Sequence, residues 1–215
     1  MRNLIIALFI ISSIFYVFFY SSIYDPLKMV FKLIPMLLII LLVILSKAPN
    51  VKTYKGYVLI GLIFCAIGDY TLQWFIVGLI SFLIGHLFYI RAFSTTKEQE
   101  VPLIAKILLI IYGLVMALVI AGALIQSENM VLAIAVLCYI FVILTMGWTS
   151  FRTGSKFAMI GAFLFIISDS VLAVNKFVVS VDFSHQLIMT TYYGAQIFLA
   201  LSIVNYSAIK GKGVQ

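Results

Sequence analysis

Two aspartates within apolar segments are the residues of this sequence with the clearest potential for chemistry. Asp69 and Asp169 lie 100 residues apart in two similar stretches, GLIFCAIGDYTL at 61–72 and GAFLFIISDSVL at 161–172. An ionisable group in a membrane span costs about 2.5–3.5 kcal/mol, so its presence there suggests a function. Two neighbouring carboxyl groups can divide the roles of acid and base between them. The simpler alternative is that each aspartate caps a helix end or pairs with a lysine.

Further polar side chains interrupt the apolar segments near these motifs. Residues three or four positions apart share a helix face, which places His86 beside Tyr89 and Tyr192 beside Gln196. We therefore expect polar side chains from five segments to converge on one interior cavity in the outer half of the membrane. The residues that stand out in these segments are Lys28, Lys32, Asp69, Gln73, His86, Tyr89, Ser168, Asp169, Asn175, Lys176, Thr190, Thr191, Tyr192, Tyr193 and Gln196.

Several of these residues also have a purely structural interpretation. His86 can be a hydrogen-bonded packing residue, and Tyr192 and Tyr193 can belong to an aromatic belt at the membrane surface. Lys176 can extend to the membrane boundary and pair there with Asp182, whereas Lys32 lies deeper and can meet a carboxylate or a lipid phosphate.

The segments that carry these residues are long enough to be membrane-spanning helices. Apolar windows of about 20 residues can be laid out eight times, at 4–21, 29–46, 56–73, 76–93, 103–125, 130–150, 156–175 and 185–208. Backbone groups in lipid must be satisfied internally, so we predict an all-α membrane protein. The first, fifth and sixth windows have almost no ionisable groups, and we expect them to form a lipid-facing scaffold.

The distribution of basic residues predicts the orientation of these helices. With the windows above, eleven of the 14 Lys and Arg residues lie on the side of the N-terminus, and only Lys28, Lys32 and Lys176 lie on the other. The positive-inside rule then places both termini in the cytoplasm. An even number of helices separates the two Asp motifs, which predicts a parallel 4+4 repeat with halves at about 1–93 and 103–210. The stretch at 93–102 would be a cytoplasmic linker within a single domain, 1–215.

Composition limits the class of protein in the same direction. The chain is 65% hydrophobic and only 10% charged, too apolar to cover a soluble globule. Its net charge of +7 is spread between the apolar windows rather than gathered in a basic arm, so we expect no nucleic-acid partner. The expected partner is the lipid bilayer, and the sequence does not indicate an oligomeric state.

The chain resembles the YhhN-like integral membrane family, which includes the lysoplasmalogenases. The resemblance covers nearly the whole length and is carried by the GDxxL of Gly68–Leu72, the GAxLFxxSDxxLA of Gly161–Ala173, the GHxxY of Gly85–Tyr89, the segment from Lys32 to Pro35 and the TYYGAQ of Thr191–Gln196. It implies a hydrolase in a plasma membrane of bacterial type that cleaves the vinyl ether bond of lysoplasmalogens. The products would be a fatty aldehyde and a glycerophospho-base.

The polar residues suit that reaction, which needs a general acid, a carboxylate to stabilise a cation, and a dry site. We assign the acid and cation-stabilising roles to Asp69 and Asp169, and expect His86 to orient an aspartate or activate water. We expect the lysophospholipid substrate to be bound by Lys32, Tyr89, Ser168, Tyr192, Tyr193 and Gln196. The reaction requires no metal and no cofactor.

Two other classes of function fit the same residues. A lipid or small-molecule transporter or scramblase without hydrolytic activity would also have repeated halves and charges within the membrane. However, no Gly or Pro break adjoins either aspartate in a way that would suggest an unwound helix. A membrane scaffold, in which the polar residues only fix helix packing, is the third interpretation.

Overall fold

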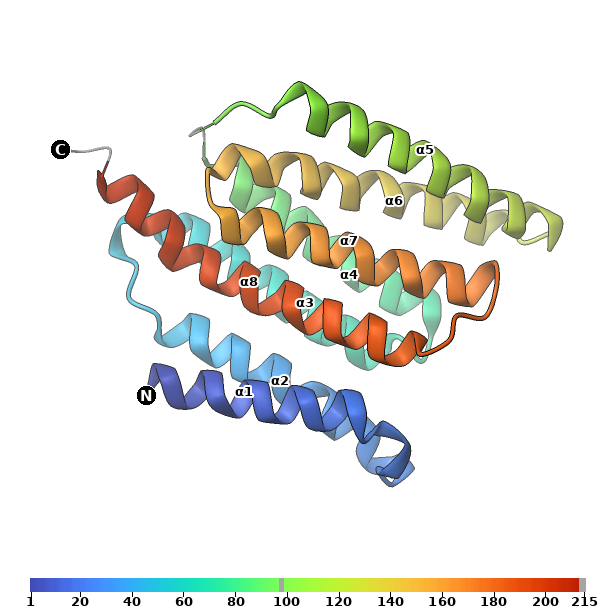
Figure 1. The fold of residues 1–215 in the computed structure, drawn as a ribbon, viewed down its shortest axis with the longest axis horizontal. Coiled ribbons are helices and arrows are strands. Elements are labelled where there is room, and N and C mark those ends of the chain that lie inside the picture. Colours follow the sequence, from blue (N-terminus) through green and yellow to red (C-terminus); the bar gives the residue numbers. More distant parts are fainter. Residues whose placement is uncertain (97–98, 213–215) are drawn as a thin grey trace.

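A computed structural model of the protein describes residues 1–96 and 99–212, and these residues form helices and loops without a strand. Lys97 and Glu98, in the predicted linker, lie outside the described residues. The eight α-helices (Figure 1) are α1 (Arg2–Phe18), α2 (Asp25–Leu45), α3 (Lys52–Thr71), α4 (Phe75–Ser94), α5 (Leu103–Gln126), α6 (Met130–Ser150), α7 (Lys156–Phe177) and α8 (Ser184–Lys212).

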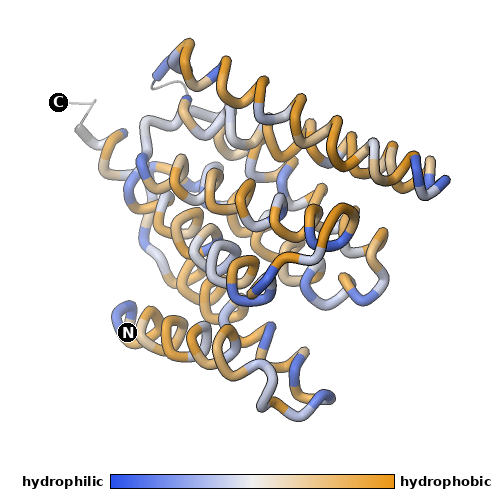
Figure 2. The backbone as a smooth tube through the Cα atoms, turned by 45° about the vertical axis from the view of Figure 1, so that its right-hand side comes forward, coloured by the Kyte–Doolittle hydropathy of each residue, from blue (hydrophilic) through white to orange (hydrophobic). Residues whose placement is uncertain are grey.

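These helices coincide with the eight predicted windows, and their ends differ from the predicted ones by at most four residues. Helices α2 to α8 are long and apolar enough to cross a membrane. Helix α1, with 17 residues, is shorter than the usual span of about 20 residues. Pro35 lies inside α2, which continues past it from Asp25 to Leu45. Hydropathy along the backbone follows the same plan, with apolar helices and hydrophilic turns (Figure 2).

The helices are arranged in pairs along the bundle. Helices α3 and α4 pack extensively on each other, as do α7 and α8, and these four form the middle of the bundle. The pair α1–α2 covers one side through contacts with α3 and α8, and the pair α5–α6 covers the other through contacts with α4 and α7. Figure 1 shows the start of α1 and the end of α8 at the same end of the bundle.

Glycines in the two Asp-bearing helices allow their partner helices to approach closely. A Cβ atom at Gly161 in α7 would lie 3.0 Å from the carbonyl oxygen of Ala195 in α8. At the matching position in α3, a Cβ atom at Gly61 would lie 2.5 Å from the ring of Tyr89 in α4. Small residues at such contacts are typical of helix packing in membranes. Because an aspartate follows each glycine by eight residues, this packing also sets the position of both carboxyl groups.

Candidate functional site

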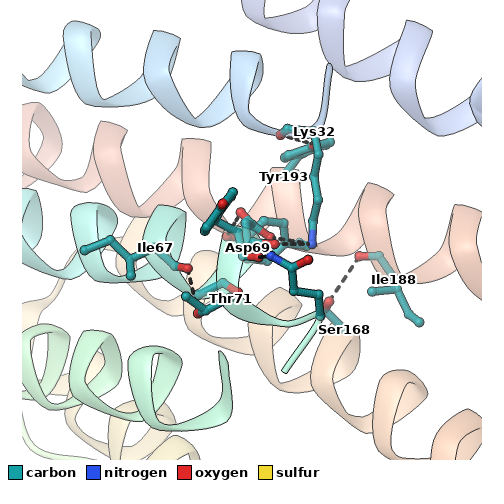
Figure 3. Close-up of polar contacts among 11 residues, drawn as sticks. Lys32, Ile67, Asp69, Thr71, Ser168, Ile188 and Tyr193 are labelled. Carbon is teal, nitrogen blue, oxygen red and sulfur yellow. Dashed lines mark hydrogen bonds and ion pairs between the residues drawn. The ribbon is translucent and has the colours of Figure 1, made fainter. Parts of the chain in front are cut away.

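Asp69 lies near the end of α3 and is bound by side chains from two other helices. Its side chain is buried, with the residue only 2% exposed. The ammonium group of Lys32, in α2, lies 3.2 Å from the Oδ1 atom of Asp69 and also donates to its backbone carbonyl at 3.0 Å (Figure 3). The hydroxyl of Tyr192, in α8, donates to Oδ2 at 2.6 Å. Both carboxylate oxygens therefore have a partner within the protein.

The surrounding predicted residues are also hydrogen-bonded within the protein. Tyr193 donates to the backbone carbonyl of Lys32 at 2.8 Å, which fixes the helical turn that carries this lysine. Ser168 donates to the carbonyl of Ile188 at 3.0 Å (Figure 3). In addition, Tyr89 and Gln196 are joined through the Tyr89 hydroxyl and the Gln196 Oε1 atom at 2.8 Å. Of the two partners expected for Lys32, a carboxylate and a lipid phosphate, the structure shows the carboxylate of Asp69.

Asp169 lies in the middle part of α7 and has different partners. The hydroxyl of Tyr139, in α6, donates a hydrogen bond to its Oδ2 atom. Beside it, the hydroxyls of Tyr112 in α5 and Ser170 in α7 share a hydrogen bond. No ion pair involves Asp169 among the residues that the structure describes.

Tyr139 and Tyr112 were missed by the sequence analysis, which treated their helices as a lipid-facing scaffold. A tyrosine does not stand out in an apolar segment rich in aromatic residues. One signal could have found Tyr139: in each half, the helix that precedes the Asp-bearing helix supplies a partner, Lys32 for Asp69 and Tyr139 for Asp169. The scaffold prediction therefore does not hold for α5 and α6, because both helices contribute side chains to the set around Asp169.

A narrow apolar cavity lies beside Asp169. The space open to the centre of a water-sized sphere is about 50 Å³. Most of the walls come from α4, α5, α6 and α7, together with Leu72 at the end of α3. The polar groups in the wall are Asp169, Tyr139, Tyr112 and Ser170, and Asp69 is not among the lining residues. The walls therefore place apolar side chains next to one carboxyl group.

His86 lies between the two sets of polar residues. It is fully buried, and neither ring nitrogen has a hydrogen-bond partner among the described residues. The ring centroid of His86 lies 4.5 Å from that of Phe165 and 5.3 Å from that of Tyr139. Phe165 in turn contacts the ring of Tyr192, with centroids 5.5 Å apart. Aromatic rings thus occupy the interior between the Tyr192 partner of Asp69 and the Tyr139 partner of Asp169.

The predicted convergence of polar residues is therefore seen as two neighbouring sets rather than one shared cavity. Asp69 belongs to a set from α2, α3 and α8, and Asp169 belongs to a set from α5, α6 and α7. His86 makes no hydrogen bond to either aspartate in the described residues. Buried polar groups without a protein partner commonly bind water, and the side-chain nitrogen of Gln196 is a second such group.

The fold and these polar sets define a helical integral membrane protein with two carboxyl groups in its interior. The chain belongs to the YhhN family, whose model matches residues 27–203. It is 34% identical over 168 residues to the human protein "Lysoplasmalogenase TMEM86A", covering 68% of this chain and 65% of that relative. It is 36% identical over 160 residues to the mouse protein "Lysoplasmalogenase TMEM86B", covering 72% of this chain and 66% of that relative.

A more distant relative is the "Lysoplasmalogenase homolog" of Dictyostelium discoideum, 30% identical over 159 residues, with 59% of this chain and 52% of the relative covered. The chain thus spans slightly less than two thirds of the length of the curated mammalian relatives described above. No solved structure matches the chain significantly.

Proposed function

We propose that this protein is a membrane-embedded hydrolase that cleaves the vinyl ether bond of lysoplasmalogens. The observation that carries the proposal is the similarity to relatives named lysoplasmalogenase, at 34% and 36% identity. The residues in the interior are compatible with it, since the reaction needs carboxyl groups and a water-poor site. The substrate would be a lysophospholipid drawn from the surrounding bilayer.

The reaction adds one water molecule across the vinyl ether. An acid transfers a proton to the outer carbon of the double bond, which leaves an oxocarbenium-like cation at the carbon bonded to oxygen. Water attacks that carbon and loses a proton to a base, giving a hemiacetal. The hemiacetal then breaks its bond to the glycerol oxygen, which takes up a proton. The products are a fatty aldehyde and a glycerophospho-base, so atoms and charge balance.

We assign the two carboxyl groups to different parts of this sequence. Asp169 faces the apolar cavity, where it can reach an alkenyl chain, so we assign it the proton transfer to carbon. Asp69 is an ion-paired carboxylate beside Lys32, which suits stabilising the cation or guiding water. His86 and the Gln196 amide are buried groups with hydrogen-bonding capacity to spare, and we propose that they hold the attacking water.

The other residues that were predicted to bind substrate are better suited to positioning Asp69, Gln196 and the helices around them. Lys32, Tyr192 and Tyr193 bind Asp69 or the backbone that carries its partner, and they would hold this carboxylate in place. Tyr89 would hold Gln196 in the same way. Ser168 would fix the start of α8 against α7 through the carbonyl of Ile188.

The test is the release of fatty aldehyde by purified protein incubated with lysoplasmalogens of different head groups, followed by mass spectrometry. We expect aldehyde from the wild type and a large loss in Asp69→Asn and in Asp169→Asn. Asp25→Asn is the matched control, because Asp25 is exposed and its ion-pair partner in the described part of the chain is Lys28 of its own helix. Unchanged release in both interior variants would refute the assigned roles. No aldehyde from the wild type with any head group, together with lipid flux in proteoliposomes, would favour the transporter or scramblase.

We also propose the parallel 4+4 arrangement with both termini in the cytoplasm. The equivalent pairs α3–α4 and α7–α8, each closed around a glycine eight residues before an aspartate, support the repeat. The excess of Lys and Arg on the side of the termini supports the orientation. The test is labelling of single cysteines with a membrane-impermeant reagent in intact cells. Cysteines at Asn3 and Lys210 should be protected, and one at Ser21 should react; the reverse pattern would refute the orientation.

A further inference from the structure

Lys176 is a cation that has no ion-pair partner among the described residues, and it lies at one end of the cavity beside Asp169. It is exposed in the last turn of α7, and its Nζ atom lies 4.6 Å from the ring centroid of Phe75 and 6.0 Å from that of Phe177. Both of these rings line the cavity, and they contact each other edge to face at 5.4 Å. The sequence-based pairing of Lys176 with Asp182 is not among the ion pairs of the described residues.

Lys176 and Asp169 lie on the same stripe of one continuous helix. Seven residues separate them, which corresponds to about 10.5 Å along the axis and a rotation of only about 20°. Leu172 and Ala173, which lie between them, also line the cavity. Along this stripe of α7, an exposed ammonium group, two apolar residues of the cavity wall and a carboxyl group therefore follow one another.

The other two lysines towards this end of the bundle are already paired. Lys32 is bound to Asp69 in the interior, and Lys28 lies 2.6 Å from Asp25 within its own helix. Lys32 would have to abandon a buried carboxylate to bind a phosphate, and leaving such a charge unpaired is costly. Lys176 incurs no such cost, because its ammonium group rests on an aromatic ring and can rotate towards an anion.

We propose that Lys176 binds the phosphate of a lysophospholipid whose ether bond lies at Asp169. This inference rests on the proposed function and names the head-group site of the same reaction. An extended glycerophosphate can bridge a separation of roughly 10 Å when the flexible lysine side chain leans towards it. The apolar chain would continue into the cavity and the adjoining bilayer. Lys176 is then a binding and specificity residue for the phosphate, a role that the sequence analysis had given to Lys32.

The experiment compares two substrates that differ only in the phosphate, a lysoplasmalogen and the corresponding 1-alkenylglycerol, in wild type, Lys176→Gln and Lys176→Arg. A charge-assisted contact to phosphate predicts a rise of about tenfold in the KM for lysoplasmalogen in Lys176→Gln. Lys176→Arg should remain close to wild type, and the KM for alkenylglycerol should not change. Lys106→Gln is the matched control, since this lysine also lies over an aromatic ring, that of Trp148.

Binding of a saturated 1-alkyl lysophospholipid, which has no vinyl ether to cleave, separates this inference from the proposed function. Its Kd should rise in Lys176→Gln by the same factor, whether or not the protein releases aldehyde. An unchanged Kd and an equal KM effect on both substrates would refute the phosphate site. Absence of aldehyde from wild type, with the Kd shift present, would refute only the hydrolase.

Discussion

Replacing Lys32 with methionine removes the cation that is paired with Asp69. The side chains of this pair are 13% and 3% exposed, and the pair bridges α2 and α3. The methionine fills a similar volume, so the change mainly removes charge and two contacts of the ammonium group. Asp69 then keeps only the hydroxyl of Tyr192 as a side-chain partner among the described residues.

The expected effect follows from the burial of this carboxylate. Removing one partner of a buried ion pair typically costs about 3–5 kcal/mol, because the other charge remains in a low-dielectric interior. Removing both charges restores much of that loss. We therefore expect Lys32→Met to lower the free energy of unfolding by about 3 kcal/mol or more, and Lys32→Met/Asp69→Asn to recover most of it.

Equilibrium unfolding in mixed micelles, followed through the fluorescence of Trp74 and Trp148, measures these differences. Wild type, both single variants and the double variant form a double-mutant cycle, which isolates the coupling between the two side chains. The reasoning would be refuted if the free energy of unfolding of Lys32→Met lay within about 0.5 kcal/mol of the wild-type value, the margin to which independent sites are additive. A double variant no more stable than Lys32→Met would refute it as well.

Three further predictions concern packing and the interior polar groups. Gly161→Ala should lose about 1–3 kcal/mol of stability, since its methyl group would lie 3.0 Å from the backbone oxygen of Ala195. Gly122→Ala is the control and should lose none, because a methyl group there would have nothing within 4 Å. Equal stability of the two variants in micelles would contradict this prediction. His86→Phe should have a melting temperature no lower than that of wild type, because it removes two ring nitrogens that have no hydrogen-bond partner among the described residues. The same variant should release less aldehyde. A marked drop in its melting temperature would show that the nitrogens are satisfied. Tyr139→Phe removes the hydrogen bond to Asp169 and should lower kcat for aldehyde release with a smaller effect on KM. A change confined to KM would argue against a role of Tyr139 in the chemical step.

The helices could be predicted from sequence because the signal for each one is local. An apolar run of about 20 residues spans the hydrocarbon regardless of its neighbours, and polar turns end each run. All eight helices accordingly lie where predicted, and α1 differs only in being shorter than the other seven. A functional role for Asp69 could be proposed for a similar reason, since a carboxyl group in an apolar run is conspicuous without any knowledge of contacts.

The partners of the carboxyl groups depend on packing between segments far apart in the chain. Asp69 and Tyr192 are 123 positions apart, and only the rotation of α8 against α3 brings the hydroxyl to the carboxylate. Tyr139 looks like any aromatic residue of an apolar helix until α6 packs on α7 and points it at Asp169. The sequence by itself therefore determined the membrane class, the helix boundaries and the presence of two interior acids. The tertiary structure decided which side chain pairs with which, because hydropathy reports the depth and length of a helix but not the face it turns to its neighbours.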